Sequence, residues 1–347
     1  MTNCRNSQYN RYWDNYCYKM LFICICVFST TVFPSFASTI PSFEAWQAEL
    51  RTEALSKGIS PDVFDTAFMG LQPIKRVIEL DRSQPEFTMT LDTYLSKVVS
   101  NTRVKNARQK LTEHKKVLEE VSKKFGVQSR FIVALWGIET NFGQHTGGFP
   151  VIAALATLAH DGRRSAYFRG ELLNALQIIE EGHITSKNMK GSWAGAMGQS
   201  QFMPSSFFSY AQDFDGDGKK DIWNSELDTF ASIANYLSKN GWDYSELWGK
   251  RIKVQREIFD LFPPRAEKSG CRALNHHSVK LPLEDWRDLG IDSGRLAMGK
   301  TYALLRLSDA ADQTYLVGSN FETILQYNCA NKYAVSVGLL ADHLAEI

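Results

Sequence analysis

The fold is decided by the stretch Ala134-Leu135-Trp136-Gly137-Ile138-Glu139-Thr140-Asn141-Phe142-Gly143, an apolar helical run that carries one carboxylate and stops at glycine. A helix that Ser129 caps and that runs to about Phe142 places Glu139 among apolar neighbours. Those neighbours are Leu135, Trp136 and Phe142. A carboxyl group held against apolar side chains loses hydration of its charged form, so its pKa rises and it can donate a proton near neutral pH. The alternative is a helix-end glutamate whose carboxylate reaches solvent or a backbone amide.

The N-terminus has the pattern of a secretory signal. A polar, basic stretch precedes the apolar run from Met20 to Phe33, and Ser35-Phe36-Ala37 then gives a small-x-small cleavage pattern. We predict a signal peptide over residues 1–37 and therefore a periplasmic protein. The alternative is a membrane anchor, but the apolar run is shorter than the roughly 18–20 residues that a span needs. Membrane association is retained as a second expectation.

Composition and charge exclude several classes of function. The 347 residues are 44% hydrophobic and 22% charged, which is typical of soluble globular proteins. Removing residues 1–37 takes three basic and one acidic residue from totals of 39 and 38, which leaves 36 and 37 and a net charge of −1. This balance predicts no nucleic-acid partner. No dinucleotide-binding glycine motif, P-loop or zinc-type cysteine and histidine spacing occurs in the sequence.

Two cysteines remain after residues 1–37 are removed, Cys271 and Cys329. An exported chain that keeps an even pair can oxidise it, so a disulfide between the two is one expectation. Two unpaired, buried thiols are the other expectation. The spacing alone does not decide between them.

Helical periodicity dominates the chain. We predict helices over Phe43–Gly58, Pro61–Gly70, Thr102–Phe125, Arg130–Phe142, Val151–Ala159, Ala166–Glu181, Thr229–Lys239, Glu322–Tyr327 and Tyr333–Glu346. Residues 71–90 are expected to be a long ordered connection. Strand patterns are confined to Trp248–Val254, Tyr302–Leu307 and Thr314–Val317, and the last two are expected to form a hairpin.

The predicted fold class is therefore α+β and predominantly α-helical. We divide the chain into a signal peptide (1–37), an N-terminal helical region (38–101), a catalytic core with a calcium-type loop (102–245), a small β-containing region (246–320) and a C-terminal helix that returns to the core (321–347).

Residues 191–206, Gly-Ser-Trp-Ala-Gly-Ala-Met-Gly-Gln-Ser-Gln-Phe-Met-Pro-Ser-Ser, are dense in glycine, hydroxyl and amide groups. Glycines let the backbone approach a ligand closely. The side chains of Ser192, Gln199 and Gln201 can hydrogen-bond sugar hydroxyls or N-acetyl groups. The alternative is a tight helix crossing, which needs the glycines but not two glutamines.

Residues 213–221 match the first half of a calcium-binding loop. Asp213, Asp215 and Asp217 occupy the first, third and fifth positions, and Gly218 provides the turn at the sixth. The twelfth position is Asn224 instead of glutamate, so the predicted ligand set is completed by Lys219, Asp221 and Asp228. We expect a structural Ca²⁺ here and no cofactor for catalysis. A metal-free turn is the alternative, although three adjacent carboxylates repel one another without a cation.

Taken together, W-G-I-E-T-N-F-G, the glycine-rich segment, the aspartate loop and Tyr327-Asn328 with Tyr333 resemble the lytic murein transglycosylase B family (glycoside hydrolase family 103). The similarity covers nearly all of the chain from Phe43. It implies a lysozyme-like helical core. It also implies cleavage of the MurNAc-β-1,4-GlcNAc bond of peptidoglycan without water, which gives 1,6-anhydromuramoyl ends.

The resemblance also assigns roles to individual residues. It makes Glu139 the single acid and base, Ser192 and Gln201 glycan contacts, and Tyr327, Asn328 and Tyr333 a polar-aromatic wall near the acid. Tyr94 matches, through a weaker local motif, a tyrosine beside the glutamate. One extra residue between Trp223 and Asp228 departs from the family pattern of the metal loop.

No second carboxylate suited to a hydrolytic glycosidase is evident in these motifs. A hydrolytic muramidase and a non-catalytic peptidoglycan-binding protein remain the alternatives. We expect a monomer that acts on peptidoglycan glycan strands, with cell-wall synthesis proteins as further candidate partners.

Overall fold

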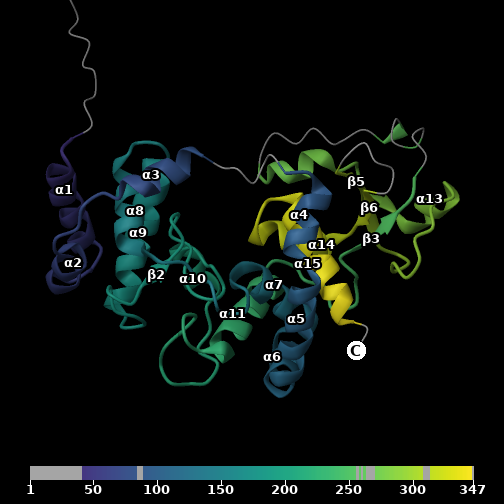
Figure 1. Ribbon diagram of the computed structural model, residues 1–347, viewed down its shortest axis with the longest axis horizontal. Coiled ribbons are helices and arrows are strands. Elements are labelled where there is room, and N and C mark those ends of the chain that lie inside the picture. The colour runs from purple at the N-terminus through teal and green to yellow at the C-terminus, as the bar shows by residue number, and fades with distance from the viewer. Residues whose placement is uncertain are drawn as a thin grey trace, which may run out of the picture. The chain divides into compact units, whose positions relative to one another are not determined.

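The computed structural model describes residues 41–83, 89–254, 258, 261–262, 270–307 and 313–345 (Figure 1). The predicted signal peptide lies outside the described residues. The described chain is mainly helical with a small sheet, so the predicted fold class is confirmed. Within this part of the chain, no helix combines the length and the apolarity that crossing a membrane requires.

Short hydroxyl side chains set where several helices begin. Ser42, Ser60, Thr90, Ser100 and Ser225 each accept a hydrogen bond from a backbone N–H of the first turn that they precede. The helices are α1 (Phe43–Ser56), α2 (Pro61–Phe68), α3 (Lys75–Arg82), α4 (Leu91–Val98), α5 (Asn101–Glu113), α6 (Lys115–Phe125), α7 (Ser129–Thr140), α8 (Val151–His160), α9 (Ser165–Glu180), α10 (Pro204–Tyr210), α11 (Glu226–Lys239), α13 (Leu283–Asp288), α14 (Ser319–Tyr327) and α15 (Asn331–Leu344), with a short 3₁₀ helix η2 (Arg272–His276).

Residues 71–90, expected to be a long ordered connection, contain the helix α3 that the sequence did not predict. Tertiary contacts fix this helix. The Ile74 N–H donates to Thr157 Oγ1 at 2.9 Å, and the buried Asp81 carboxylate pairs with Arg163 and Arg164. A buried carboxylate is tolerated only when it is paired in this way. None of these partners is close to α3 in sequence, which is why local periodicity missed it.

The single helix predicted over Thr102–Phe125 is broken at His114 into α5 and α6. The His114 ring packs edge-on against Trp136 at 5.7 Å and Phe230 at 5.2 Å between ring centroids. The break redirects the chain so that α5 packs on α7 and α15, while α6 packs on α7 and α11.

The predicted hairpin is confirmed. Strands β5 (Thr301–Arg306) and β6 (Thr314–Val317) pair antiparallel in a four-stranded sheet of order β3-β6-β5-β4, in which β3 is Gly249–Ile252 and β4 is Leu281–Pro282. A second, two-residue pairing joins β1 (Phe149–Pro150) to β2 (Lys190–Gly191). The sequence analysis did not predict β1, β2 or β4, because each is only two residues long.

Three apolar clusters form the interior. The first unites α5, α6, α7, α11, α14 and α15 with residues of β5 and β6. The second contains α1, α2 and α3 together with α8, α9 and α10, and the third lies between the sheet and α13. Helices α1–α3 therefore share their core with part of the predicted catalytic region. The predicted boundaries between regions stay predictions.

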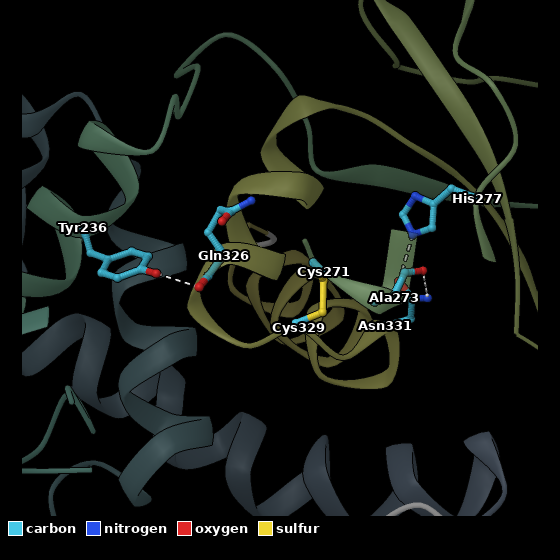
Figure 2. Close-up of a disulfide and its surroundings, with 7 residues drawn as sticks. All are labelled: Tyr236, Cys271, Ala273, His277, Gln326, Cys329 and Asn331. Atoms are coloured by element: carbon cyan, nitrogen blue, oxygen red, sulfur yellow. Dashed lines mark hydrogen bonds between the residues drawn. A yellow bond between two sulfur atoms is a disulfide. The ribbon is translucent and has the colours of Figure 1, made fainter. Parts of the chain in front are cut away.

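A disulfide links Cys271, just before η2, to Cys329, in the short connection between α14 and α15 (Figure 2). The expectation of a bridge is confirmed over that of two free thiols. It closes a separation of 58 residues and ties the β-containing region to the C-terminal helices.

Candidate active site

Helix α7 carries Glu139 through the interior, and eight of its twelve residues are buried. A helix that is apolar on all sides forms only when other elements surround it. Ser129 was predicted to be the N-cap of this helix. The structure makes it the first helical residue instead, and Gln128 is in the N-cap position. The Ser129 hydroxyl instead donates to the Leu118 carbonyl at 3.1 Å, which anchors the start of α7 to α6.

The chain turns sharply after Glu139, because three consecutive residues are left-handed. Asn141, Phe142 and Gly143 have φ of 49°, 61° and 80°, and only glycine adopts such values without strain. The Phe142 ring offsets this strain by packing edge-on to Trp136, over Gly137. A Cβ at Gly137 would lie 2.6 Å from that ring, so any larger residue there would have to displace the Phe142 ring. The helix end at Thr140, two residues earlier than predicted, is thereby fixed.

Glu139 is partly exposed at the boundary between the first core cluster and solvent. Burial raises its pKa to about 7, because the surrounding protein removes water from the charged form. The Tyr333 hydroxyl donates to Glu139 Oε1 at 2.5 Å and opposes part of that rise. The alternative of an ordinary solvated helix-end glutamate does not fit this environment.

Three tyrosines from three helices converge near this carboxyl group. Tyr333 lies in the first turn of α15, Tyr327 ends α14, and both are close enough to Glu139 for its charge to raise their pKa. Tyr94, on α4, acts electrostatically on Tyr333. Burial is the main cause that raises the pKa of Tyr327 and Tyr333 well above the ordinary value, so both remain neutral hydrogen-bond donors.

No other carboxylate of the described chain contributes to the pKa shift of Glu139. Two acidic residues of the neighbouring sequence, Asp161 and Glu171, have partners of their own. Asp161 accepts from Arg82 at 3.0 Å, and Glu171 accepts from the hydroxyl and the N–H of Ser205. Among the described residues, the site therefore presents one carboxyl group that accepts from the Tyr333 hydroxyl.

The glycine-rich segment lies against α7, and its three predicted sugar-binding side chains have different surroundings. Ser192 Oγ accepts from the N–H groups of Ala194 and Ala196 and so closes its own turn. Gln199 is buried: its Oε1 accepts from Trp136 Nε1 at 2.8 Å and its Nε2 donates to the Trp223 carbonyl at 3.1 Å. Both polar atoms of Gln199 are therefore already engaged inside the protein, and its predicted sugar contact stays a prediction.

Gln201 and Asn328 are more accessible. Gln201 is left-handed, with φ of 52°, and its Nε2 donates to the carbonyls of Thr146 and Gly198 at 3.0 and 2.9 Å. None of the described residues is recorded as donating to its Oε1, so this oxygen can accept from a ligand hydroxyl. Asn328 is exposed at the end of α14. The Tyr327 hydroxyl donates inward, to the Ser200 carbonyl at 2.5 Å, and so ties α14 to the glycine-rich segment.

Sequence reasoning missed Tyr236 on α11. Its hydroxyl donates to the Gln326 carbonyl at 2.6 Å, and its ring lies 4.6 Å from that of Tyr327. The sequence did contain one indication of its role. Tyr236 lies on the buried face of a predicted helix, and a buried tyrosine hydroxyl needs a hydrogen-bond partner.

A family model described as "Transglycosylase SLT domain" matches residues 42–342. The chain belongs to this family. The predicted relationship is confirmed over nearly all of the described chain.

Individual relatives of the chain support the same family assignment. The chain is 32% identical over 255 residues to the membrane-bound lytic murein transglycosylase B of Escherichia coli K12, a match that spans 73% of this chain and 66% of that relative. SltB3 of Pseudomonas aeruginosa, solved in complex with NAG-anhNAM-pentapeptide, superposes with a TM-score of 0.81 and 40% identity over 88% of this chain and 80% of that one. E. coli Slt35 in complex with calcium superposes with a TM-score of 0.72 and 27% identity, over 86% of this chain and 92% of that one. These fold relatives confirm the predicted lysozyme-like architecture.

The aspartate loop of the transglycosylase forms a second polar cluster. Carboxylate oxygens of Asp213, Asp215 and Asp217 lie within 4.8 Å of one another. Three close oxygens of this type fit a hard divalent cation, which would offset their mutual repulsion. The loop backbone is already in a turn, since Gly216 and Gly218 donate to Asp213 at 2.7 and 3.0 Å.

The other predicted ligands have different surroundings. Asp228 is fully buried and accepts from the N–H groups of Phe214 and Asp221 at 2.7 and 2.8 Å, and burial raises its pKa. Asp221 accepts from Trp223 and Asn224. Neither belongs to the close group of three carboxylates. Lys219 donates its N–H to Asp217, and only its carbonyl, at the seventh loop position, has the chemistry of a ligand.

Proposed function

We propose that this protein is a lytic transglycosylase that cleaves the MurNAc-β-1,4-GlcNAc bond of peptidoglycan without water, with Glu139 as the single acid and then base. The observation that carries the proposal is a lone carboxyl group with a pKa near 7, at the end of a buried helix and bonded to a neutral tyrosine. The anhydro sugar named in the ligand of SltB3, a relative at 40% identity, supports the same chemistry.

The first half of the reaction needs the protonated form. Glu139 donates its proton to the glycosidic oxygen, the bond to C1 of MurNAc breaks, and the N-acetyl group of the substrate stabilises the positive centre. In the second half, the Glu139 carboxylate accepts the proton of the MurNAc C6 hydroxyl as that oxygen bonds to C1. The proton returns to Glu139, and no water is consumed. The Tyr333 hydroxyl stabilises the carboxylate between the two halves.

Glycan-binding roles rest on the accessible polar groups near the acid. We assign the free acceptor of Gln201 and the exposed amide of Asn328 to sugar hydroxyls or N-acetyl groups. The Ser192 hydroxyl can still donate from a partly exposed position, and Tyr94, also partly exposed, is a further proposed contact. Tyr327 and Tyr333 form the wall behind Glu139.

Analysis of reaction products tests the proposal directly. Purified sacculi are digested with the protein, and the released muropeptides are identified by mass spectrometry. We expect 1,6-anhydromuramoyl ends. Reducing ends would favour the hydrolytic muramidase, and no release at all would favour a binding protein.

The raised pKa of Glu139 predicts an alkaline limit to activity. Because catalysis starts from the protonated acid, kcat/KM should fall about tenfold per pH unit above pH 7, while a glutamate with an ordinary pKa would already be ionised at pH 6. The measurement is a pH–rate profile on a soluble glycan. A profile that stays flat to pH 9 would contradict the role of Glu139 as the titrating acid.

We also propose that the aspartate loop binds Ca²⁺ as a structural ion, as the calcium complex of Slt35 suggests. A ligand that binds only the folded state stabilises it by about 2.7 kcal/mol at a hundredfold excess over Kd. Millimolar calcium should therefore raise Tm relative to excess EDTA, and Asp215→Asn should reduce the difference. Proton transfer by Glu139 needs no cation, so chelated protein kept well below its Tm should keep most of its activity. Identical melting curves with calcium and with EDTA would rule out the metal site.

The site of action follows from the substrate. We propose a periplasmic protein, and the name of the E. coli relative keeps membrane association as an alternative. Peptidoglycan glycan strands are its proposed partner. A monomeric state and contacts with cell-wall synthesis proteins stay predictions.

A further inference from the structure

The connection between α14 and α15 separates the two tyrosines nearest the acid. Tyr327 precedes it and Tyr333 follows it by two helical residues. Its own backbone bonding is sparse: Asn328 donates to Ile324 at 3.2 Å and Ala330 to Asn328 at 2.7 Å. Both residues are extended, and α15 begins without a side-chain cap. Local structure therefore does little to fix where α15 starts.

Three lateral contacts supply what the backbone lacks (Figure 2). Before the connection, the Tyr236 hydroxyl holds the Gln326 carbonyl at 2.6 Å. In its middle, Cys329 is bonded to Cys271. After it, Asn331 makes the third contact through two hydrogen bonds: its Nδ2 donates to the Ala273 carbonyl at 2.8 Å, and its Oδ1 pairs with His277 Nε2 at 2.9 Å. We call these three contacts the clamp.

Two of the three contacts reach the same segment, residues 271–277, which belongs to the β-containing region. Asn331 and His277 are buried, so their bond is shielded from water. The clamp thus connects a region without any proposed catalytic residue to the first turn of α15. A shift of that turn moves the Tyr333 hydroxyl, which reaches Glu139 across a 2.5 Å hydrogen bond.

We propose that Cys329, bridged to Cys271, and Asn331 are positioning residues for the acid: they keep the Tyr333 hydroxyl on Glu139 during turnover. The inference rests on the proposed function of Glu139. Misplacement of a catalytic group by about 1 Å can reduce a rate by about a hundredfold, so a clamp on this turn has a measurable effect.

The test compares oxidised protein with protein reduced by dithiothreitol. The reagent is oxidised to its cyclic disulfide, while the Cys271–Cys329 bond is reduced to two thiols. The Cys271→Ser variant is a second form without the bridge. The substrate is a soluble tetrasaccharide with one cleavable bond, assayed at 15 °C after circular dichroism confirms folding. We expect kcat to fall about tenfold or more, with KM within about twofold.

A pH profile distinguishes positioning from general loosening. Tyr333 from α15 and Tyr327 from α14 are the described titratable groups coupled to Glu139, and Tyr94 from α4 is coupled to Tyr333. Tyr327 and Tyr333 are neutral donors at the pH of the assay, because burial raises the pKa of both well above the ordinary value. Loss of the Tyr333 bond removes an interaction that lowers the pKa of Glu139. The alkaline limb of the reduced protein should therefore move to higher pH.

Two variants complete the design. In a Tyr333→Phe background, reduction should change neither kcat nor the profile further, because the group through which the clamp acts is gone. Leu50→Ala removes core packing on α1, a helix that carries no residue of the clamp, and should lower Tm without changing kcat.

Reduced, folded protein with kcat within twofold of the oxidised form would overturn the proposal, as would an undiminished loss in the Tyr333→Phe background. If the reduced protein does not fold, the Asn331→Ala variant with the disulfide intact is assayed in its place. An unchanged kcat and pH profile in that variant would also overturn the proposal. Failure of the proposed function is recognised separately, since oxidised wild-type protein would then release no anhydro product.

Discussion

Glu139→Gln should abolish sacculus lysis while glycan binding persists. The amide keeps the shape of the side chain and can still accept the Tyr333 hydrogen bond, but it has no transferable proton. General acid–base catalysis by one positioned group contributes about 10²–10⁴-fold, and here the same residue serves both halves of the reaction, so the loss should be at least that large. Anhydro-product release, followed by mass spectrometry, is the measurement.

A matched control is Glu119→Gln, an exposed glutamate of α6 whose ion-pair partner is Lys115. It makes the same chemical change away from the site and should leave turnover unaltered. Residual activity of Glu139→Gln within tenfold of wild type would remove Glu139 from the proposed role.

Gln199→Met should cause a large loss of stability. The substitution keeps most of the side-chain volume but leaves the Trp136 indole N–H and the Trp223 carbonyl without their partners. Each buried, unsatisfied group costs about 1–3 kcal/mol, so unfolding should become easier by about 2–6 kcal/mol. Chemical denaturation monitored by tryptophan fluorescence gives this value.

Gln201→Met provides the comparison, because it makes the same change at a partly exposed position two residues later. Its effect should fall mainly on KM, with a smaller loss of stability. A Gln199→Met protein as stable as wild type but with a raised KM would support the sugar-binding role that the sequence suggested for Gln199.

Part of the environment of Glu139 is readable from the sequence, because Leu135 and Trp136 lie on the same helix, whereas the elements that enclose α7 come from distant segments. The disulfide and the hydrogen bond from Tyr333 to Glu139 join segments that are distant in sequence. Local sequence patterns therefore cannot predict them. Gln199 illustrates the limit. An amide in a glycine-rich loop has the same composition whether it faces a sugar or the Trp136 indole, and burial alone separates the two.

The helices show the same division. Ser42 and Ser60 mark the beginnings of α1 and α2 through caps that are readable in sequence. Helix α3 and the break at His114 depend on partners far along the chain, on Asp81 with its arginines and on the rings around His114. Periodicity over a short window contains no information about either.

Because α7 is enclosed by other helices, the unfolded chain is expected to be inactive. Without the surrounding helices, Glu139 is an ordinary glutamate with a pKa near 4.5 and is ionised at neutral pH, so it has no proton to give. The proposed acid thus depends on closure of the core around the helix that carries it. The ability to cut a glycan strand therefore emerges together with tertiary structure, and a chain that has formed only local helices is harmless to the polymer around it.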